Sequence, residues 1–396
     1  MIPLLKGFRI LDLTAVILGP YATQIMGDLG AEVIKIEPPD GDSMRPIAPV
    51  AAPGMSAVFA NCNRNKRSVV LDLKSEAGKA ALMQLIPTAD ALVHNMRQEA
   101  LDKLGFTYKA VHAANPRIIY AAAVGYGRHG RYAGKPAYDD VIQAASGFAG
   151  LFQMRDGEPL YTPSIAADKV SGLHLAYAVM AALLYRQRTG KSPGYVEVPM
   201  YELMAAFSLC EHMSSATFKE DGKLGYIRVI SPSRKPYKTS DGWVGVLPYS
   251  EANWRKILAE IRRPDVVETS WFGNATERSA RVDELYNILA EAMPSRSTAE
   301  WMATFERLDI PAQPVRLPED LLKDPHLSDV GFFEPRFAGE TPCLRSLRQA
   351  VNVEDVASEP DLAPPMLGAD TAAVLREAGL SEEEIAKLAV SSRKSR

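Results

Sequence analysis

Two segments decide the fold, Phe8-Arg-Ile-Leu-Asp-Leu-Thr14 and Glu32-Val-Ile-Lys-Ile-Glu37. Both are short and rich in apolar or β-branched residues, which is typical of buried strands. Between them, Gly19-Pro20 opens a stretch in which apolar residues recur at helical spacing as far as Gly30. Proline is favoured in the first turn of a helix, and glycine commonly ends one. The region therefore predicts a β-α-β unit, whose two strands run parallel.

The same alternation continues along the chain. Further strands are predicted at residues 68–73, 91–94, 118–124 and 194–199, and further helices at 78–86 and 201–212. Strands that alternate with helices indicate a mostly parallel sheet with helices on both faces. The sequence therefore predicts an α/β fold with a Rossmann-like parallel sheet in its large domain.

A change in composition marks a domain boundary. Residues 219–236 are rich in Gly, Lys, Arg, Ser and Pro, which is typical of a linker. We divide the chain into a large α/β part at 1–218, a linker with a smaller α+β domain at 219–325, and a C-terminal part at 326–396. The small domain has helices predicted at 253–262, 278–292 and 298–308, and the C-terminal part has strand-like segments near Phe332 and Val351. A final helix begins with the capping-box pattern Ser381-Glu-Glu-Glu384.

Bulk properties exclude several classes of protein. The 396 residues include 45 basic and 48 acidic side chains, a balance that argues against a dedicated nucleic-acid or polybasic membrane protein. The three cysteines, Cys62, Cys210 and Cys343, are too scattered for a disulfide framework. The longest apolar run, residues 173–185, is too short to cross a bilayer. With no signal-peptide pattern at the N-terminus, we expect a cytoplasmic protein.

Several familiar motifs are absent or out of context. Gly125-Tyr-Gly127-Arg-His-Gly130 matches a dinucleotide-binding pattern, but loop residues rather than a helix follow it. The six histidines show no metal-binding spacing, and no G-x-S-x-G elbow occurs. We therefore expect neither a nicotinamide or flavin site nor a metal site nor a serine hydrolase.

The segment Ile165-Ala-Ala-Asp168-Lys-Val-Ser-Gly172 places one carboxylate at the start of a long, small-residue-rich helix. Asp168 has two interpretations at this position. Asp is a common helix cap. Alternatively, the free N–H groups and the positive end of the helix dipole favour an ionised, nucleophilic carboxylate and an oxyanion formed beside it.

Basic residues gather in loops near the predicted strand ends. They occur at residues 63–67 and 128–135 and at Lys74, Arg97 and Lys103. Each alone is typical of a solvated surface, but together they favour a polyanionic ligand whose phosphates need cations.

In order along the chain, these segments resemble the class III coenzyme A transferase family, which includes formyl-CoA and carnitine CoA transferases. The matching pieces lie at residues 7–14, 19–20, 29–37, 41–42, 65–74, 95–97, 101–105, 115–120, 138–147 and 165–190. The likeness covers most of the first two hundred residues and continues more weakly to the C-terminus.

The resemblance implies a nucleophilic role for Asp168, which unites the two interpretations of that residue. A carboxylate at this position attacks an acyl-CoA to give an acyl-aspartyl anhydride, and the released CoA thiolate then forms an aspartyl-CoA thioester. A carboxylic acid acceptor opens that thioester. The mechanism needs no tightly bound cofactor, because coenzyme A enters as part of the substrate.

The family also implies where CoA binds and how chains assemble. Adenine would lie near Leu71, Asp72 and Lys74, with phosphates and pantetheine near Asn95, Met96, Arg97, Ala100, Lys103 and Leu104. Val16 and Ile17 would line the reacting end, and Lys135 and Tyr138 would border the site. Family members form interlocked homodimers, so the C-terminal part at 326–396 would return to the large CoA-binding domain.

Three departures from the family limit what the resemblance says of substrates. Ile17 stands where formyl-CoA transferases carry glutamine, which disfavours oxalate as the acceptor. Residues 225–237 are poor in glycine where those relatives have a glycine-rich flap. Pro136 takes the place of a phosphate-binding lysine, with Lys135 adjacent.

Two alternative functions stay open. A 2-methylacyl-CoA racemase of the same fold needs an acid–base pair, and such racemases carry histidine where Tyr138 stands; a tyrosine proton is much less available near neutral pH. A CoA-binding protein without turnover would keep its affinity for CoA when Asp168 is replaced. The sequence identifies neither the donor nor the acceptor.

Overall fold

The structure is a computed structural model that describes residues 1–334, 337–338, 343 and 345–394. Its contacts group the chain into two compact units. The first contains residues 1–146, 161–207 and 328–396, and the second contains 147–160 and 208–327. The division into domains at 218 and 326 stays a prediction.

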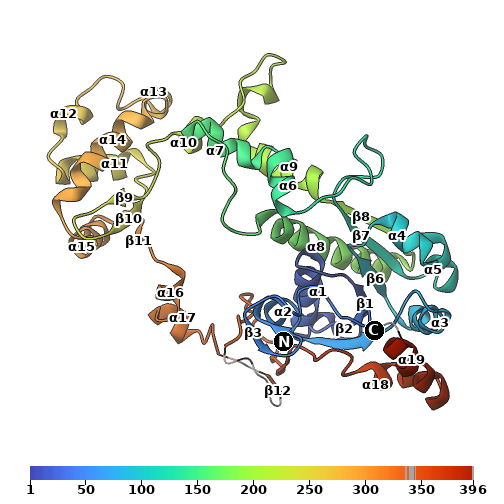
Figure 1. The fold of residues 1–396 in the computed structure, drawn as a ribbon. Helices are drawn as coiled ribbons and strands as arrows, with labels where there is room; N and C mark the ends of the chain where they lie inside the picture. Colours follow the sequence, from blue (N-terminus) through green and yellow to red (C-terminus); the bar gives the residue numbers. More distant parts are fainter. Residues whose placement is uncertain (335–336, 339–342, 344, 395–396) are drawn as a thin grey trace. The chain divides into compact units, whose positions relative to one another are not determined.

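The first unit is built on a six-stranded sheet with the order β5-β2-β1-β6-β7-β8. Its strands are β1 (Arg9–Leu13), β2 (Glu32–Glu37), β5 (Lys66–Val70), β6 (Ala91–His94), β7 (Ile119–Val124) and β8 (Tyr195–Pro199). Every neighbouring pair is parallel; Ile10, for example, pairs with Val33 on one side and Ala91 on the other. The predicted parallel sheet is confirmed (Figure 1).

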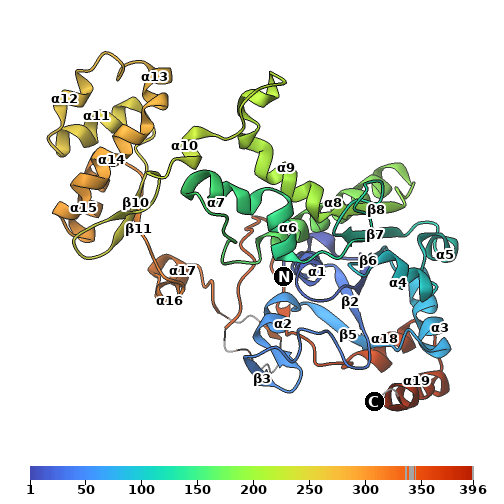
Figure 2. The same cartoon turned by 45° about the horizontal axis from the view of Figure 1, so that its top comes forward.

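Helices cover both faces of this sheet, because side chains of a strand alternate between them. Leu11 joins a core with residues of α3 (Glu76–Leu85), α5 (Tyr108–Ala114), α18 (Thr371–Glu377) and α19 (Glu382–Lys394). Figure 2 shows where these helices lie in the first unit. Its neighbour Asp12 points the other way and accepts a hydrogen bond from Thr23 of α1 (Leu18–Asp28). On that face α1 packs against the long helix α8 (Ala166–Thr189).

The C-terminal residues of the first unit complete its core. Val374 and Leu375 are fully buried in the same cluster as Leu11 and Leu92. The capping box of α19 is confirmed, since the Ser381 hydroxyl accepts from the Glu384 N–H while Glu384 accepts from the Ser381 N–H. The strands expected near Phe332 and Val351 are wrong: Phe332 lies in a turn, and β12 (Phe337–Ala338) and β13 (Asp361–Leu362) pair instead.

The second unit is an α+β arrangement with its own core. An antiparallel sheet of order β11-β10-β9 packs with four helices around buried Trp254, Phe272, Tyr286 and Trp301. The strands are β9 (Tyr237–Lys238), β10 (Trp243–Val246) and β11 (Ala312–Pro314), and the helices are α11 (Glu251–Glu260), α12 (Pro264–Val267), α14 (Val282–Ala292) and α15 (Thr298–Leu308). A further helix, α13 (Ala275–Ala280), precedes α14 and has no buried residue. The single helix expected at 278–292 is thus two helices, which meet at Arg281.

The structure contains further elements besides these. They are η1 (Pro3–Leu5), β3 (Val50–Ala52), β4 (Met55–Ser56), α2 (Ala57–Cys62), η2 (Ile86–Thr88), α4 (Gln98–Lys103), α6 (Asp139–Ala145), α7 (Phe148–Asp156), α9 (Met200–His212), η3 (Ser214–Thr217), α10 (Ile227–Ile230), η4 (Met293–Ser295), α16 (Pro318–Leu321) and α17 (Pro325–Asp329).

Candidate active site

The sheet topology identifies where a ligand would bind. In an open parallel sheet, ligands bind beyond the carboxyl ends of the strands, at the point where the strand order reverses. Here the chain moves from β1 to β2 on one side and later to β6 on the other, so that point lies between β1 and β6. The loops that follow these two strands are joined by hydrogen bonds: the Ala15 N–H donates to Asn95 Oδ1 (3.0 Å), and Asn95 Nδ2 donates to the Ala15 carbonyl (2.8 Å).

This arrangement brings together two groups of residues named from the resemblance. Val16 and Ile17 follow β1, and Met96 follows Asn95 after β6. Ile17 is largely buried, with 9% of its surface exposed. The Asn95 side chain is engaged with the neighbouring loop, a role that the sequence did not indicate.

The other residues expected to bind CoA lie along the same edge or on the elements that follow it. Leu71, Asp72 and Lys74 follow β5, Arg97 precedes α4, Ala100 and Lys103 lie on α4, and Leu104 caps it. Lys74, Arg97 and Lys103 are exposed. Lys135 and Tyr138 lie in the segment before α6, with Lys135 Nζ 4.3 Å from the centre of the Tyr132 ring. The structure joins none of these residues directly to Asn95.

Asp168 lies at the third position of α8 and does not cap it. The cap residue is Ile165, and no side chain makes a capping hydrogen bond there. The helix end was expected to favour ionisation of Asp168, and two other influences act on this carboxyl in the opposite direction. Burial, together with the negative charge of Asp139, raises the pKa of Asp168 to about 6. At pH 7 such a carboxyl is still roughly nine-tenths ionised.

Asp139 holds the start of α8 and was missed by the sequence analysis. One of its oxygens, Oδ1, accepts the Asp168 N–H (2.9 Å), and Oδ2 accepts from Gln143 Nε2 (2.6 Å). Gln143 is fully buried, and its Oε1 accepts the Thr162 N–H (3.0 Å), which ties down the chain entering α8. The Asp168 N–H is therefore occupied, although the position at the start of the helix had suggested free N–H groups here for an oxyanion. In the sequence, the only sign of this role was the acidic pair Asp139-Asp140, which lies in the segment 138–147 that resembles the family.

Gly172 brings the β1–α1 loop close to Asp168. It lies one helical turn beyond Asp168, on the same face of α8. A Cβ atom at Gly172 would lie 2.7 Å from the Leu18 carbonyl oxygen and 3.1 Å from the Tyr21 ring. Only glycine permits this approach of α1, so the first turn of α1 and the residues just before it lie beside the start of α8.

The glycine-rich pattern at 125–130 does not form a phosphate cradle. The Gly127 N–H donates to Glu202 Oε1 (2.9 Å), and the Arg128 N–H donates to Glu197 Oε1 (3.1 Å). Two carboxylates thus occupy the N–H groups that a phosphate would need, and their charge would repel it. This geometry agrees with the rejection of a dinucleotide site.

The basic run at residues 63–67 does not face the candidate site. Arg64 donates to Asp28, Lys66 to Asp12, and Arg67 to Glu32 and Glu377. Arg64 and Arg67 lie at the amino end of β5, opposite the edge at which ligands bind. The Lys66 ammonium is buried beneath the β1–α1 loop, where it also donates to the Pro20 carbonyl. The expected polyanion-binding cluster therefore loses these members. It retains Lys74, Arg97 and Lys103 and the basic residues within 128–135, all of which are exposed.

In the part of the chain that the structure describes, no three His, Cys, Asp or Glu side chains gather where they could hold a metal ion. Over the same residues, no helix has the length and hydropathy needed to span a bilayer.

Comparison with known proteins gives the family. The chain matches the family described as CoA-transferase family III over residues 5–371. It is 30% identical over 417 residues to formyl-CoA:oxalate CoA-transferase of Shigella sonnei, covering 97% of this chain and 98% of that protein. It is 35% identical over 312 residues to the probable fatty acyl-CoA transferase Rv3272 of Mycobacterium tuberculosis, covering 75% and 79%.

Solved structures agree with the sequences. A crystal structure of Rv3272 superposes with a TM-score of 0.79 at 31% identity, covering 94% of this chain and 99% of that one. A CAIB/BAIF family protein from Brucella suis gives 0.80 at 27% identity, covering 96% and 100%. The chain therefore belongs to CoA-transferase family III and is a class III CoA-transferase, which confirms the predicted family.

Proposed function

We propose that this enzyme moves coenzyme A from an acyl-CoA to a carboxylic acid through covalent intermediates on Asp168. The observation that carries the proposal is a half-buried carboxyl at the start of α8, beside the loop after β1, with a pKa of about 6. Such a group is ionised at neutral pH and is shielded enough from water to act as a nucleophile.

The proposed steps balance without a further reactant. The Asp168 carboxylate attacks the thioester carbonyl, and the C–S bond breaks to give an acyl-aspartyl anhydride and a CoA thiolate. The thiolate attacks the aspartyl carbonyl, which releases the donor acid and leaves an aspartyl-CoA thioester. An acceptor carboxylate opens that thioester to a second anhydride, and the thiolate then takes the acceptor acyl group and frees Asp168.

The carboxyl edge of the sheet supplies the proposed CoA site. Exposed Lys74, Arg97 and Lys103 are the cations for its phosphates, because charge-assisted hydrogen bonds to phosphate need such donors. The other residues proposed to line it are Val16, Ile17, Leu71, Asp72, Asn95, Met96, Ala100, Leu104, Lys135 and Tyr138.

The residues proposed to line the acyl end of the site support an apolar substrate. Ile17 is mostly buried and follows Ala15, whose carbonyl is bound by Asn95. Met96 follows Asn95 on the neighbouring loop. An apolar wall leaves the second carboxylate of oxalate without a polar partner, which carries a large desolvation penalty. We therefore propose an acyl donor with an apolar chain, in line with the relative named a probable fatty acyl-CoA transferase.

We also propose that the chain acts as an interlocked homodimer, as its family resemblance implies. Leu173, Tyr177 and Leu184 lie along α8 at helical spacing, and each is about half exposed. A row of large apolar side chains on the helix that carries the nucleophile supports burial by a second copy. Light scattering on the purified protein would give twice the monomer mass; a monomer at micromolar concentration would contradict the dimer.

Intact-protein mass spectrometry tests the proposed chemistry. The wild type, Asp168→Ala and the matched control Asp140→Ala are each incubated with a pool of acyl-CoA thioesters, with and without hydroxylamine. Asp140 is an exposed neighbour of Asp139 on α6. We expect a hydroxylamine-sensitive adduct on the wild type and on Asp140→Ala, and none on Asp168→Ala.

The same samples separate the alternatives. An adduct on Asp168→Ala would contradict the assignment of the nucleophile. Exchange of the α-proton of a 2-methylacyl-CoA with D₂O, without an adduct, would identify a racemase. CoA binding without either reaction would identify a binding protein.

A further inference from the structure

Val16 has a backbone conformation that its side chain disfavours. Its φ is 72°, in the left-handed region, which a β-branched residue rarely adopts. Such conformations persist only where surrounding groups enforce them, and they concentrate at functional sites. Val16 lies immediately before α1, whose first turn contacts Gly172 one turn beyond Asp168.

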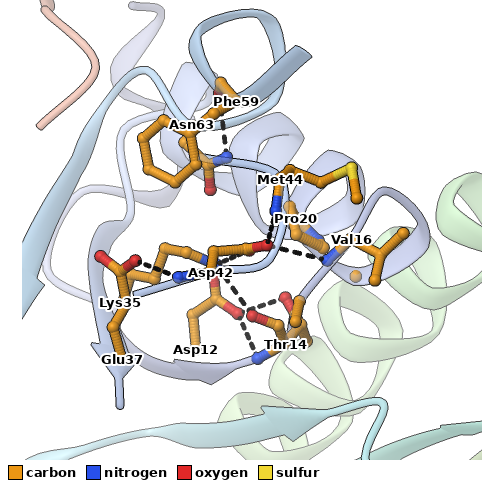
Figure 3. A network of polar contacts seen from close by, with 12 residues as sticks. Asp12, Thr14, Val16, Pro20, Lys35, Glu37, Asp42, Met44, Phe59 and Asn63 are labelled. Atoms are coloured by element: carbon orange, nitrogen blue, oxygen red, sulfur yellow. Dashed lines mark hydrogen bonds and ion pairs between the residues drawn. The ribbon is translucent and has the colours of Figure 1, made fainter. Parts of the chain in front are cut away.

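Four side chains from outside the loop hold its backbone from Thr14 to Val16. Asp12 Oδ1 accepts the Thr14 N–H (2.9 Å), and Lys35 Nζ donates to the Thr14 carbonyl (2.8 Å). Asn95 binds both polar groups of Ala15. Asp42 Oδ1 accepts the Val16 N–H (3.3 Å) and is therefore the group that acts directly on the strained residue (Figure 3).

Asp42 is itself held by an ion pair and by hydrogen bonds. It is 3% exposed, and its Oδ2 lies 2.9 Å from the fully buried Nζ of Lys35. Its Oδ1 also accepts the Met44 N–H (2.9 Å), and its own N–H donates to Glu37 Oε2 (3.0 Å). Lys35 thus links the Asp42 carboxylate to the Thr14 carbonyl. The loop from Thr14 to Val16 and the side chains that hold it are therefore joined in one network of polar contacts (Figure 3).

We propose that Asp42 is a positioning residue for the transfer reaction: its carboxylate, paired with Lys35, holds the Val16 N–H and keeps Val16 in the left-handed conformation. This inference rests on the proposed function of Asp168. Rotation at Val16 would move Ile17 and the first turn of α1, and that turn packs on α8 at Gly172, one helical turn beyond the nucleophile. Misplacement of reacting groups by about 1 Å costs on the order of 10²-fold in rate.

Asp42→Asn tests the proposal, because it keeps the shape of the side chain and removes the charge that pairs with Lys35. We expect kcat to fall about 10- to 100-fold with KM changed less than about threefold, since orientation rather than CoA binding is affected. The matched control is Asp28→Asn, another buried carboxylate, which pairs with Arg64 at the far end of α1. It is expected to lower stability and leave kcat, measured below its unfolding temperature, within about twofold.

A double-mutant cycle of Asp42 and Val16 distinguishes a positioning role of Asp42 from a general loss of structure. Glycine adopts a positive φ without strain, whereas alanine keeps the penalty and also lacks the valine side chain. In a Val16→Gly background we expect Asp42→Asn to lower kcat by less than about threefold; in a Val16→Ala background the full loss should remain. Equal losses in the two backgrounds, or an unchanged kcat in Asp42→Asn alone, would overturn the proposal.

Two further readouts keep the test informative. If Asp42→Asn folds poorly alone, the glycine and alanine double variants still provide the comparison. Hydrogen exchange at residues 15–19 should become faster in Asp42→Asn and not in Asp28→Asn. A wild type that forms no adduct with any acyl-CoA contradicts the proposed function instead, because the exchange and stability results do not depend on turnover.

Discussion

Two groups of charged side chains in the first unit, one buried and one half-buried, differ in the balance of positive and negative charge. Beneath the loop after β1, Asp12, Glu37 and Asp42 meet Lys35, Arg45 and Lys66 at ion-pair distance. At the start of α8, Asp139 and Asp168 lie together, and no cation among the described residues is within ion-pair distance of either. The first group satisfies its charges and fixes a backbone. The second leaves like charges unpaired, as a site does when it must tune a reactive group.

The contrast extends to the pKa values. Burial opposes ionisation of Asp12, but Lys66 and Lys35 outweigh it and lower the pKa of that carboxyl. At Asp168, burial and Asp139 act in the same direction and raise the pKa to about 6. The same physical cost of burying a carboxylate is therefore compensated in one group and retained in the other.

The largest effect on stability should follow from removing a cation from the first group. Lys35→Met leaves Asp42 and Asp12 without a shared cation, and breaking a buried pair from one side costs about 3–5 kcal/mol. Urea unfolding at pH 7 measures the loss. A change below about 1 kcal/mol would show that the network contributes little to stability.

In the second group, Asp168→Asn is expected to raise the free energy of unfolding, by less than Lys35→Met lowers it. Asp168→Asn removes a carboxylate whose pKa is raised from 3.8 to about 6, so the folded state no longer holds an unfavourable charge. At 1.36 kcal/mol per unit this gives a gain of up to about 3 kcal/mol. As pH rises from about 4 to 6, the unfolded wild type releases a proton that the folded state still retains, and this destabilises the wild type. The gain should therefore be absent at pH 4 and complete above pH 6; thermal unfolding at both pH values checks it.

The pH dependence of activity tests the raised pKa of Asp168 and the contribution of Asp139 to it. Transfer needs the ionised Asp168, so kcat/KM should rise with pH to a plateau, with an apparent pKa near 6. Asp139→Asn keeps an oxygen for the Asp168 N–H but removes the like charge, which should shift the rise to lower pH. Asp140→Asn is the control, and an equal shift in both variants would contradict a specific role for Asp139.

The smallest effect is expected at the opposite edge of the sheet. Glu377 pairs with Arg67 and is 44% exposed, and pairs of this kind contribute about 0–1 kcal/mol. Glu377→Gln should therefore change the unfolding free energy by less than about 1 kcal/mol and leave activity unchanged. Together with Lys35→Met, this variant compares exposed with buried pairing in one molecule.

The sequence predicted the sheet well because buried parallel strands and their helices leave strong local patterns. The strands at 32–37 and 91–94 lie where the apolar runs placed them. The segments near Phe332 and Val351 failed because a short apolar pattern does not identify a strand partner. The ion pairs that engage residues 63–67 join positions far apart in the chain, so composition alone suggested a ligand site there.

The candidate site was predicted only in part, because its contacts also join positions that are far apart in the chain. The family resemblance identified Asp168 as the nucleophile to be tested, but its surroundings depend on folding. The Asp139–Asp168 hydrogen bond spans 29 positions and the Ala15–Asn95 pair spans 80. The left-handed Val16 had no signal at all, because a β-branched residue is the last choice for such a conformation.

Peptide mapping after hydroxylamine trapping tests the central claim most directly. The enzyme is incubated with an acyl-CoA donor and hydroxylamine, then cleaved with trypsin, which releases residues 156–169 as one peptide. We predict a hydroxamate on Asp168 that requires the donor, with Asp156 of the same peptide unmodified. A donor-dependent hydroxamate on another residue, or none on Asp168 under conditions in which CoA is transferred, would contradict the account.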